Sequence, residues 1–419
     1  MINISEWLAG LTRHATPDID ECISALGEHI DWLYRLKNTP QDSEWHAEGD
    51  VHIHTGMVLE ELYKILANEA THIQGTRRQA LVLAALLHDI AKPERTRAYE
   101  ADGKQRIGAP KHAYYGASYL AFKLPGLGLE FETMWSILNL VAEHHTPKIL
   151  VVRNKPKPDY LLHARQVDTE LVYWLEITDV RGRICPDVEL QLQHMEEYRM
   201  FAHEYELWGR ESDIRTSLQQ SLERLSGRAQ NYVFGHAVQQ LESGKITMAE
   251  EAIATTYEHR DNHSHVVVLC GPSGSGKSTY TSKYYPDYAL ISLDELREKF
   301  NNDRGSQKNK GQIIQFAKDQ LRENLRNKSD VVWDATNLRK DFRSIISTLA
   351  QNYHALVTLI VFIAPEDTIF RSNKERTHSV SKKVLQTQFE RYQIPLLDEA
   401  HQLFVVNQEG NVVFQSGHY

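Results

Sequence analysis

The sequence predicts a multidomain α and α/β protein, with an all-helical N-terminal domain followed by a domain built on a mostly parallel sheet. Between about Val51 and Trp208, apolar residues recur at helical spacing. From His265 onward, short apolar strands alternate with helix-like segments, as in parallel sheets covered by helices. A chain of 419 residues is also too long for one ordinary core. The expected divisions are a helical domain with an N-terminal lead-in at 1–208, a helical connector at 209–262 and an α/β domain at 263–419.

Composition narrows the class of protein. The chain is 41% hydrophobic and 25% charged, as soluble globular proteins are. No apolar run approaches the roughly 18 residues of a membrane span, and the start MINISEW lacks the basic region of a signal peptide. The three cysteines have neither metal nor disulfide spacing, which suits a reducing cytoplasm. A net charge of −9 argues against an extensively basic nucleic-acid-binding protein but allows a local basic groove.

Histidines and aspartates gather near the predicted helix ends of the helical half. His88-Asp89 ends the most apolar helix, His145 continues the stripe of Val141, and Asp179 lies on an inner helix face. Taken singly, such a histidine is more often a hydrogen-bonded structural residue than a ligand. Taken together, they resemble the way helical bundles build metal sites, and nitrogen and oxygen ligands suit Mg²⁺, Mn²⁺, Fe, Co²⁺, Ni²⁺ or Zn²⁺. The candidate metal ligands are His54, His88, Asp89, His112, His144, His145 and Asp179.

The stretch VVVLCGPSGSGKST at 266–279 matches the phosphate-binding pattern G-x-x-x-x-G-K-[ST]. Glycines let the backbone wrap a phosphate closely, and a helix that begins near Lys277 directs its positive end at the anion. Lys277 is expected to reach the β- and γ-phosphates of ATP and Ser278 to bind Mg²⁺. A Gly/Ser turn is the alternative, but the full motif after a strand favours a nucleotide site. The predicted ATP-binding residues are Gly271, Ser273, Gly274, Ser275, Gly276, Lys277, Ser278 and Thr279.

Charged residues follow the next predicted strands. The strands are expected at 265–270, 289–293, 330–333 and 356–363, with a C-terminal hairpin in LFVVNQEGNVVFQS. Asp294 follows the second strand, at the sheet edge where chemistry takes place, and shares a helix face with Arg297. Asp294 is therefore a candidate base for an attacking hydroxyl, although an aspartate there also caps a helix well.

Further along, Asp334 ends the third strand, where it is expected to orient water on Mg²⁺ or contact a basic lid residue. Arg371, Lys374 and Arg376 form a basic cluster predicted to open a helix that contains Leu385. Kinases that close a lid over the nucleotide use such arginines against the transferring phosphate. The alternative is a solvated basic face.

The series His54, His88-Asp89 and Asp179 resembles the metal-dependent phosphohydrolases of the HD superfamily, and the added histidines resemble its two-metal subtype. HTGMVLEEL, LLHDIAKP, KHAYYGASYLA and TDVRGR resemble the HD domains attached to bacterial CCA-adding tRNA nucleotidyltransferases. The resemblance covers about residues 45–190. No nucleotidyltransferase domain accompanies it, so nothing about CCA addition is implied.

The resemblance implies two metal sites and a water that attacks phosphorus. One site would be held by His54, His88, Asp89 and Asp179, and the other by His112 with one or both of His144 and His145. Lys92 is placed to neutralise a phosphoryl oxygen, and Arg181 and Arg183 to contact a substrate phosphate. Each of these three cations could equally be a solvated surface charge. His52 is the lesser candidate and is left out.

The order GPSGSGKS, SLDELR, DATN and a lid with two arginines resembles 5′-OH polynucleotide kinases of the phage and bacterial end-healing type, over about residues 265–395. This implies that Asp294 is the general base, Arg297 contacts the acceptor phosphate, and Asp334 supports the lid. Arg376 would engage the ATP phosphates, but Arg371 lies five residues earlier and remains a second candidate.

Together the two resemblances imply a bifunctional HD-domain polynucleotide kinase that heals nucleic-acid ends. Such an enzyme phosphorylates 5′-OH ends with ATP and Mg²⁺ and hydrolyses 2′,3′-cyclic, 2′- or 3′-phosphate ends with one or two divalent transition metals. Its partners would be RNA or DNA ends and a ligase that acts afterwards. Two alternatives remain: an HD nucleotidase fused to a small-molecule nucleoside-type kinase, and a regulatory NTPase whose HD domain binds a second messenger without hydrolysing it.

Overall fold

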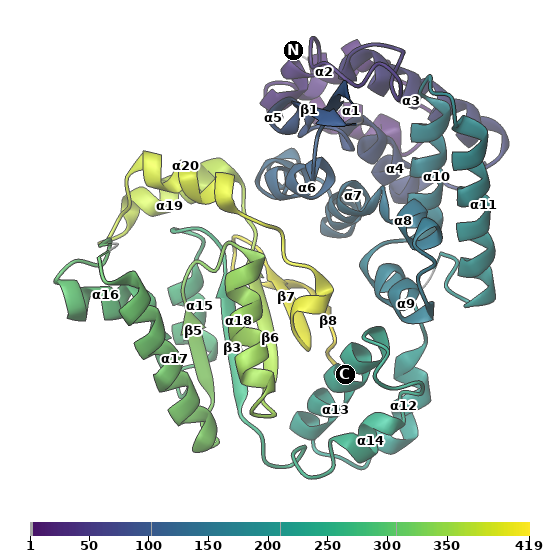
Figure 1. Ribbon diagram of the computed structural model, residues 1–419. Helices are drawn as coiled ribbons and strands as arrows, with labels where there is room; N and C mark the ends of the chain where they lie inside the picture. The colour runs from purple at the N-terminus through teal and green to yellow at the C-terminus, as the bar shows by residue number, and fades with distance from the viewer. Residues whose placement is uncertain (1–2, 102, 210, 307) are drawn as a thin grey trace. The chain divides into compact units, whose positions relative to one another are not determined.

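The computed structural model describes residues 3–101, 103–209, 211–306 and 308–419. It consists of two compact units, Met1–Ser212 and Asp213–Tyr419 (Figure 1). The first is largely helical and the second contains a six-stranded, mostly parallel sheet, which confirms the predicted fold class. Within the described residues, no helix has both the length and the apolar character needed to cross a membrane.

Two helices of the first unit, α4 (Gly75–Leu87) and α10 (Thr169–Arg181), are buried along most of their length. The other helices of this unit are α1 (Ile4–Leu11), α2 (Ile19–Leu26), α3 (Val51–Asn68), α5 (Lys92–Arg95), α6 (His112–Lys123), α7 (Phe131–Glu143), α8 (Thr146–Val152), α9 (Lys157–Gln166) and α11 (Val188–Glu204), with 3₁₀ turns at Asp31–Arg35 and Leu124–Leu127. Every residue of α4 from Arg78 to Leu87 is buried, and α3, α7 and α10 pack against it. Because α4 is covered on all sides, the polar residues that directly follow it are buried too: His88 is 0% and Asp89 is 2% exposed. The end of α4 therefore delivers His88 and Asp89 to the interior.

A β-hairpin departs from the prediction of an all-helical domain. Strands β1 (Arg97–Ala101) and β2 (Lys104–Gly108) pair antiparallel, with Arg97 opposite Gly108. The prediction that no strand interrupts this half is therefore wrong here. The sequence does contain the Asp-Gly pair typical of hairpin turns, and Gly103 has a φ of +72°. Because no residue of either strand is buried, the strands lack the apolar alternation that marks half-buried strands.

In the second unit the sheet order is β4-β5-β3-β6-β7-β8, parallel except for the last strand. The strands are β3 (His265–Cys270), β4 (Ala289–Ser292), β5 (Val331–Asp334), β6 (Leu356–Phe362), β7 (Gln402–Val406) and β8 (Val412–Ser416), and β7 and β8 form the predicted C-terminal hairpin. The helices that follow the strands are α15 (Lys277–Tyr284), α16 (Leu293–Asn301), α17 (Lys310–Arg326), α18 (Lys340–Gln351), α19 (Glu366–Glu375) and α20 (Lys382–Arg391), with a 3₁₀ turn at Leu397–Glu399.

Both faces of this sheet are covered, which explains the continuous apolar run of β3. Val267 and Leu269 pack with Tyr280 of α15 on one face. On the other, Arg343 of α18 lies against the Cys270 sulfur. Strands β4, β5 and β3 are neighbours and all parallel, so their C-terminal ends meet at one edge. The phosphate-binding loop and Asp294 follow two of those ends, and Asp334 is the last residue of β5.

Residues 213–262 form three helices that belong to the second unit: α12 (Ile214–Leu222), α13 (Gly227–Glu242) and α14 (Glu251–Thr255). They share an apolar core that includes Leu218, Val233 and Ala252. Arg228 of α13 joins them to the sheet, because its guanidinium donates to both oxygens of Asp330 at 2.6 and 2.9 Å.

Candidate functional site

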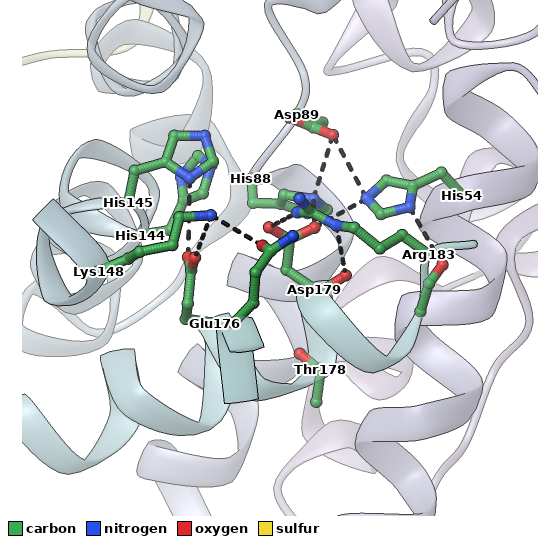
Figure 2. A network of polar contacts seen from close by, with 12 residues as sticks. His54, His88, Asp89, His144, His145, Lys148, Glu176, Thr178, Asp179 and Arg183 are labelled. Atoms are coloured by element: carbon green, nitrogen blue, oxygen red, sulfur yellow. Dashed lines mark hydrogen bonds and ion pairs between the residues drawn. The ribbon is translucent and has the colours of Figure 1, made fainter. Parts of the chain in front are cut away.

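The histidines and aspartates singled out in the first unit lie together in one buried cluster (Figure 2). They come from the first turn of α3, the end of α4, the start of α6, the end of α7 and the last turns of α10. The sequence separates the outermost of them by 125 positions, but His54 Nε2 lies 3.0 Å from Asp179 Oδ1. The members of this histidine cluster are His54, His88, Asp89, His112, His144, His145 and Asp179.

Local backbone contacts fix the direction of four of these histidine rings. The Nδ1 atoms of His88, His112 and His144 each lie 2.8 Å from a carbonyl oxygen three residues earlier. His54 Nδ1 lies 3.2 Å from the Gly182 carbonyl. A carbonyl only accepts, so each Nδ1 donates a hydrogen and each neutral ring keeps its lone pair on Nε2. All four Nε2 lone pairs are thereby available to the centre of the cluster.

Asp89 lies between two groups of these nitrogens. Its Oδ2 is 3.2 Å from His88 Nε2, and its Oδ1 is 3.0 Å from His112 Nε2. On one side, donor atoms of His54, His88 and Asp179 lie within 4.8 Å of one another; on the other, those of His112, His144 and His145 do so. The cluster thus consists of two neighbouring sets of ligand atoms with one aspartate between them.

Electrostatics and burial favour the metal-binding protonation state for three of these groups, the carboxylates of Asp89 and Asp179 and the imidazole of His144. Burial alone would raise the pKa of Asp89, but the neighbouring His88, Lys92 and His112 hold it well below the usual range. Arg183 does the same for the pKa of Asp179, against its burial. Burial, reinforced by His145, lowers the pKa of His144 well below its usual value. Ionised carboxylates and a neutral imidazole are the forms that coordinate a metal.

The residues fit divalent metal ions. Two cluster atoms, one in each set, are buried and have no hydrogen-bond partner among the described residues: His88 Nε2 and His144 Nε2. Leaving buried polar atoms unsatisfied is costly, and a cation in each set would satisfy them. The set around His54, His88, Asp89 and Asp179 suits one ion, and the set around His112, His144 and His145 suits a second.

The cations predicted beside the cluster are placed differently from one another. Lys92 is buried, not solvated, and its Nζ lies 2.7 Å from Asp89 Oδ2. Arg183 pairs with Asp179 through its guanidinium. Arg181 instead points outward and pairs with Glu69 at 2.6 Å, which matches the surface-charge alternative. His52, which is not among the predicted metal ligands, lies 3.0 Å from the exposed Asp20.

Sequence reasoning missed three polar residues that surround the cluster: His46, Glu48 and Glu176. Glu48 Oε1 lies 3.0 Å from His54 Nδ1 and 2.9 Å from His46 Nδ1. Glu176 is fully buried on α10, and burial raises its pKa. His46 and Glu48 precede α3 without any periodic pattern, so no sequence signal marks them. Glu176 could have been found, because it precedes Asp179 by three residues on the same helix face.

In the second unit, the phosphate-binding loop has the conformation its glycines were expected to allow. Gly274 and Gly276 have φ values of +86° and +92°, which side chains rarely adopt. A Cβ at Gly271 would lie 2.8 Å from Ser275 Oγ, and one at Gly274 would lie 3.0 Å from the Asn373 nitrogen of α19. Helix α15 begins at Lys277, directly after the loop. The loop is also held from α20, because Gln388 Oε1 accepts from the Ser273 amide at 2.7 Å.

Lys277 is bonded to the loop itself. Its Nζ donates to the carbonyl oxygens of Gly271 at 2.9 Å and Pro272 at 2.7 Å. Burial lowers the pKa of Lys277 to about 8, and among the surrounding charges Asp334 and Asp294 raise it while Arg376 lowers it. Three of the predicted kinase residues therefore lie close enough to act on Lys277.

Asp294 and Arg297 are paired on the first turns of α16 and lie toward solvent. The alternative role of Asp294 as a helix cap is wrong, because strand β4 ends one residue earlier than predicted and Ser292 is the cap. The Ser292 side chain accepts from the Glu295 nitrogen at 3.4 Å. This leaves the Asp294 carboxylate without a capping role.

The basic cluster closes a helix and does not open one, contrary to the prediction. Arg371 and Lys374 lie in α19, Arg376 is its C-terminal cap residue, and α20 begins only at Lys382. Ser381 caps α20, which explains why the new helix starts there. Arg376 acts on the pKa of both Lys277 and Asp334, whereas Arg371 donates to Thr368 of its own helix at 3.4 Å.

Comparison with known families agrees with this division of the chain. The HD domain family matches residues 51–172, and an AAA domain family matches residues 266–395. No curated protein matches the chain. The chain therefore carries an HD domain followed by a P-loop, kinase-like domain, and the two matches support an enzyme with metal-dependent hydrolase and kinase activities.

Proposed function

We propose that the protein heals broken nucleic-acid ends, removing a 2′,3′-cyclic, 2′- or 3′-phosphate at one end and phosphorylating the 5′-OH at the other. The observation that carries the proposal is the presence in one chain of two sites: a buried histidine cluster with unsatisfied ligand atoms, and a phosphate-binding loop in whose sheet Asp294 follows the C-terminal end of β4. Ribonucleolytic cleavage leaves both kinds of end, and a ligase needs 5′-phosphate and 3′-OH.

The hydrolase activity is assigned to the histidine cluster. Divalent ions held there supply Lewis acids that polarise a phosphoryl oxygen and lower the pKa of an attacking water. Lys92 and Arg183 place positive charge beside the ligand carboxylates, which favours a phosphate group at this position. Burial lowers the pKa values of His144 and His145, and their neutral imidazoles keep the centre able to bind cations near neutral pH.

The kinase activity is assigned to the edge of the sheet. Asp294 has no capping role and would accept the proton of the 5′-hydroxyl group while the oxygen of that hydroxyl bonds to the γ-phosphorus of ATP. The bond from that phosphorus to the bridging oxygen breaks at the same time, and ADP leaves. Lys277 and Arg376 would stabilise the charge that accumulates on the transferring group, and Ser278 would hold Mg²⁺.

Surface chemistry further along the helix that carries Asp294 favours a polynucleotide over a small-molecule acceptor. Beyond Arg297, helix α16 carries Phe300, which is 42% exposed and meets the 36% exposed Phe316 edge to face at 5.3 Å. Lys299 Nζ lies 5.9 Å from the Phe316 ring. Exposed aromatic rings beside lysines are the groups on which single-stranded bases stack. A nucleoside-type kinase has no need of such a surface.

One assay tests the proposal. A 5′-OH oligoribonucleotide ending in a 2′,3′-cyclic phosphate is incubated with ATP, Mg²⁺ and, in parallel reactions, Mn²⁺, Co²⁺ or Ni²⁺, and both ends are followed by gel and mass spectrometry. We expect both ends to change. If free nucleosides or nucleotides are turned over while neither oligonucleotide end changes, the substrate is small and the proposal fails.

A further inference from the structure

His145 is held differently from the other histidines of the cluster. Its Nε2 lies 3.3 Å from His112 Nε2, so this nitrogen faces the second set of ligand atoms. Among the described residues, no backbone carbonyl accepts a hydrogen bond from its Nδ1, which lies 3.7 Å from Glu176 Oε2. The side chain is 35% exposed, whereas those of His54 and His88 are at most 1% exposed. Neither backbone bonding nor close packing therefore fixes its ring.

Glu176, whose carboxylate lies near His145 Nδ1, lacks a hydrogen-bond donor among the described residues. It is 0% exposed, and neither carboxylate oxygen has a hydrogen-bond partner among the described residues. Lys148 Nζ is the nearest cation at 3.6 Å, but its hydrogen bond goes to Gln191 Oε1 at 2.9 Å. Figure 2 shows Glu176 below His145 and Lys148, with its carboxylate directed toward both. A buried carboxylate without a donor is unfavourable by itself, so this geometry calls for one.

We propose that Glu176 accepts the Nδ1 hydrogen of His145 and so positions His145 Nε2 as a ligand of the second metal ion. The 3.7 Å separation lies just beyond hydrogen-bonding distance, and rotation of the imidazole can close it. The hydrogen bond fixes the tautomer with its lone pair on Nε2, as outer carboxylates do for metal-bound histidines generally. Glu176 is thus a positioning residue that acts through His145. The inference rests on the proposed function, because it requires a second metal ion.

The test measures metal binding by the full-length, metal-stripped protein. Co²⁺ is titrated into wild type, Glu176→Ala, Glu176→Gln and the control Glu189→Gln, which makes the same change at an exposed position. We expect wild type and control to bind two ions. Glu176→Ala should bind the second ion roughly 10 to 100-fold more weakly and the first ion normally. Glu176→Gln keeps an acceptor oxygen and should lose less. An unchanged second-ion affinity in both Glu176 variants would overturn the proposal.

A double-mutant cycle separates positioning from direct ligation. If Glu176 acts only through His145, then Glu176→Ala should have no further effect on second-ion affinity in a His145→Ala background. An additional loss would mean that Glu176 binds the ion itself, as its closeness to His145 and Asp179 would allow, and would overturn the positioning role. Should Glu176→Ala fail to fold, the isosteric Glu176→Gln carries the same cycle. Wild type binding no more than one ion would overturn the two-metal assignment as well; two ions in wild type with unaffected variants would overturn this inference alone.

Discussion

The histidine cluster of the first unit and the phosphate-binding loop of the second both keep charged groups out of water, but they satisfy those groups in different ways. In the cluster, side chains meet side chains, and His88 Nε2 and His144 Nε2 have no hydrogen-bond partner among the described residues. In the loop, Lys277 bonds to two backbone carbonyls. The cluster therefore needs a ligand to be complete, whereas the loop must give up existing bonds when a phosphate binds.

Removing the cluster should have the largest and most selective effect. His88→Ala with Asp89→Ala deletes two ligands of the first set, one of them the aspartate that lies between the two sets. We expect metal content and phosphoesterase activity to fall below detection while kinase activity stays near wild type. The reason is that the remaining carboxylate and imidazoles cannot hold an ion alone. Elemental analysis and the two-ended oligonucleotide assay measure this. A variant that still hydrolyses the 3′-end would contradict the metal assignment.

The reciprocal change is Asp294→Ala. Loss of a general base should lower kinase kcat by about 10² to 10⁴-fold and leave phosphoesterase activity and metal content unchanged. Asp287→Ala, on the exposed turn before β4, is a matched control that should behave as wild type. If Asp294→Ala removed both activities together, the two sites would not be independent and the comparison above would break down.

In both units, the buried elements could be predicted from the sequence, whereas an exposed hairpin and a helix end could not. Helix and strand positions were predictable because burial leaves period-3.6 or continuous apolar patterns, as in α4 and β3. The exposed hairpin β1–β2 and the end of α19 at Arg376 left no such pattern, because turn and cap chemistry decided them. Clustering of the histidines could be anticipated from their helix-end positions. Glu48 could not, since only tertiary packing brings it to His54.

The aromatic surface on α16 and α17 separates polynucleotide from small-molecule acceptors. Phe300→Ala with Phe316→Ala should weaken binding of a single-stranded 5′-OH oligonucleotide by about 1–3 kcal/mol for each base that stacks. KM for a mononucleotide acceptor should not change, because it does not extend beyond Arg297. Tyr257→Ala, which removes an aromatic ring 68% exposed elsewhere in the unit, serves as control. Equal losses for long and short acceptors would show that these rings support folding and not binding.

The smallest expected effect is a pH dependence of ATP binding at the phosphate-binding loop. Because the pKa of Lys277 is lowered to about 8, this side chain is charged at pH 7 and largely neutral at pH 9 in the free protein. The phosphates of ATP are already ionised in this range, so binding above pH 8 must take up a proton. The Kd for ATP should then rise by roughly tenfold between pH 7 and pH 9.

Calorimetric titration of ATP across that range measures the effect, and proton uptake at pH 9 provides a second readout. Lys277→Met removes the titrating group, so its ATP affinity should be weak but independent of pH. If the Kd of the wild-type protein did not change with pH, Lys277 would keep its proton up to pH 9. Its two hydrogen bonds to the Gly271 and Pro272 carbonyls would then offset the effect of burial on its pKa. In that case the loop would resemble the cluster more closely, since both would hold their ligand-binding charges fixed before the ligand arrives.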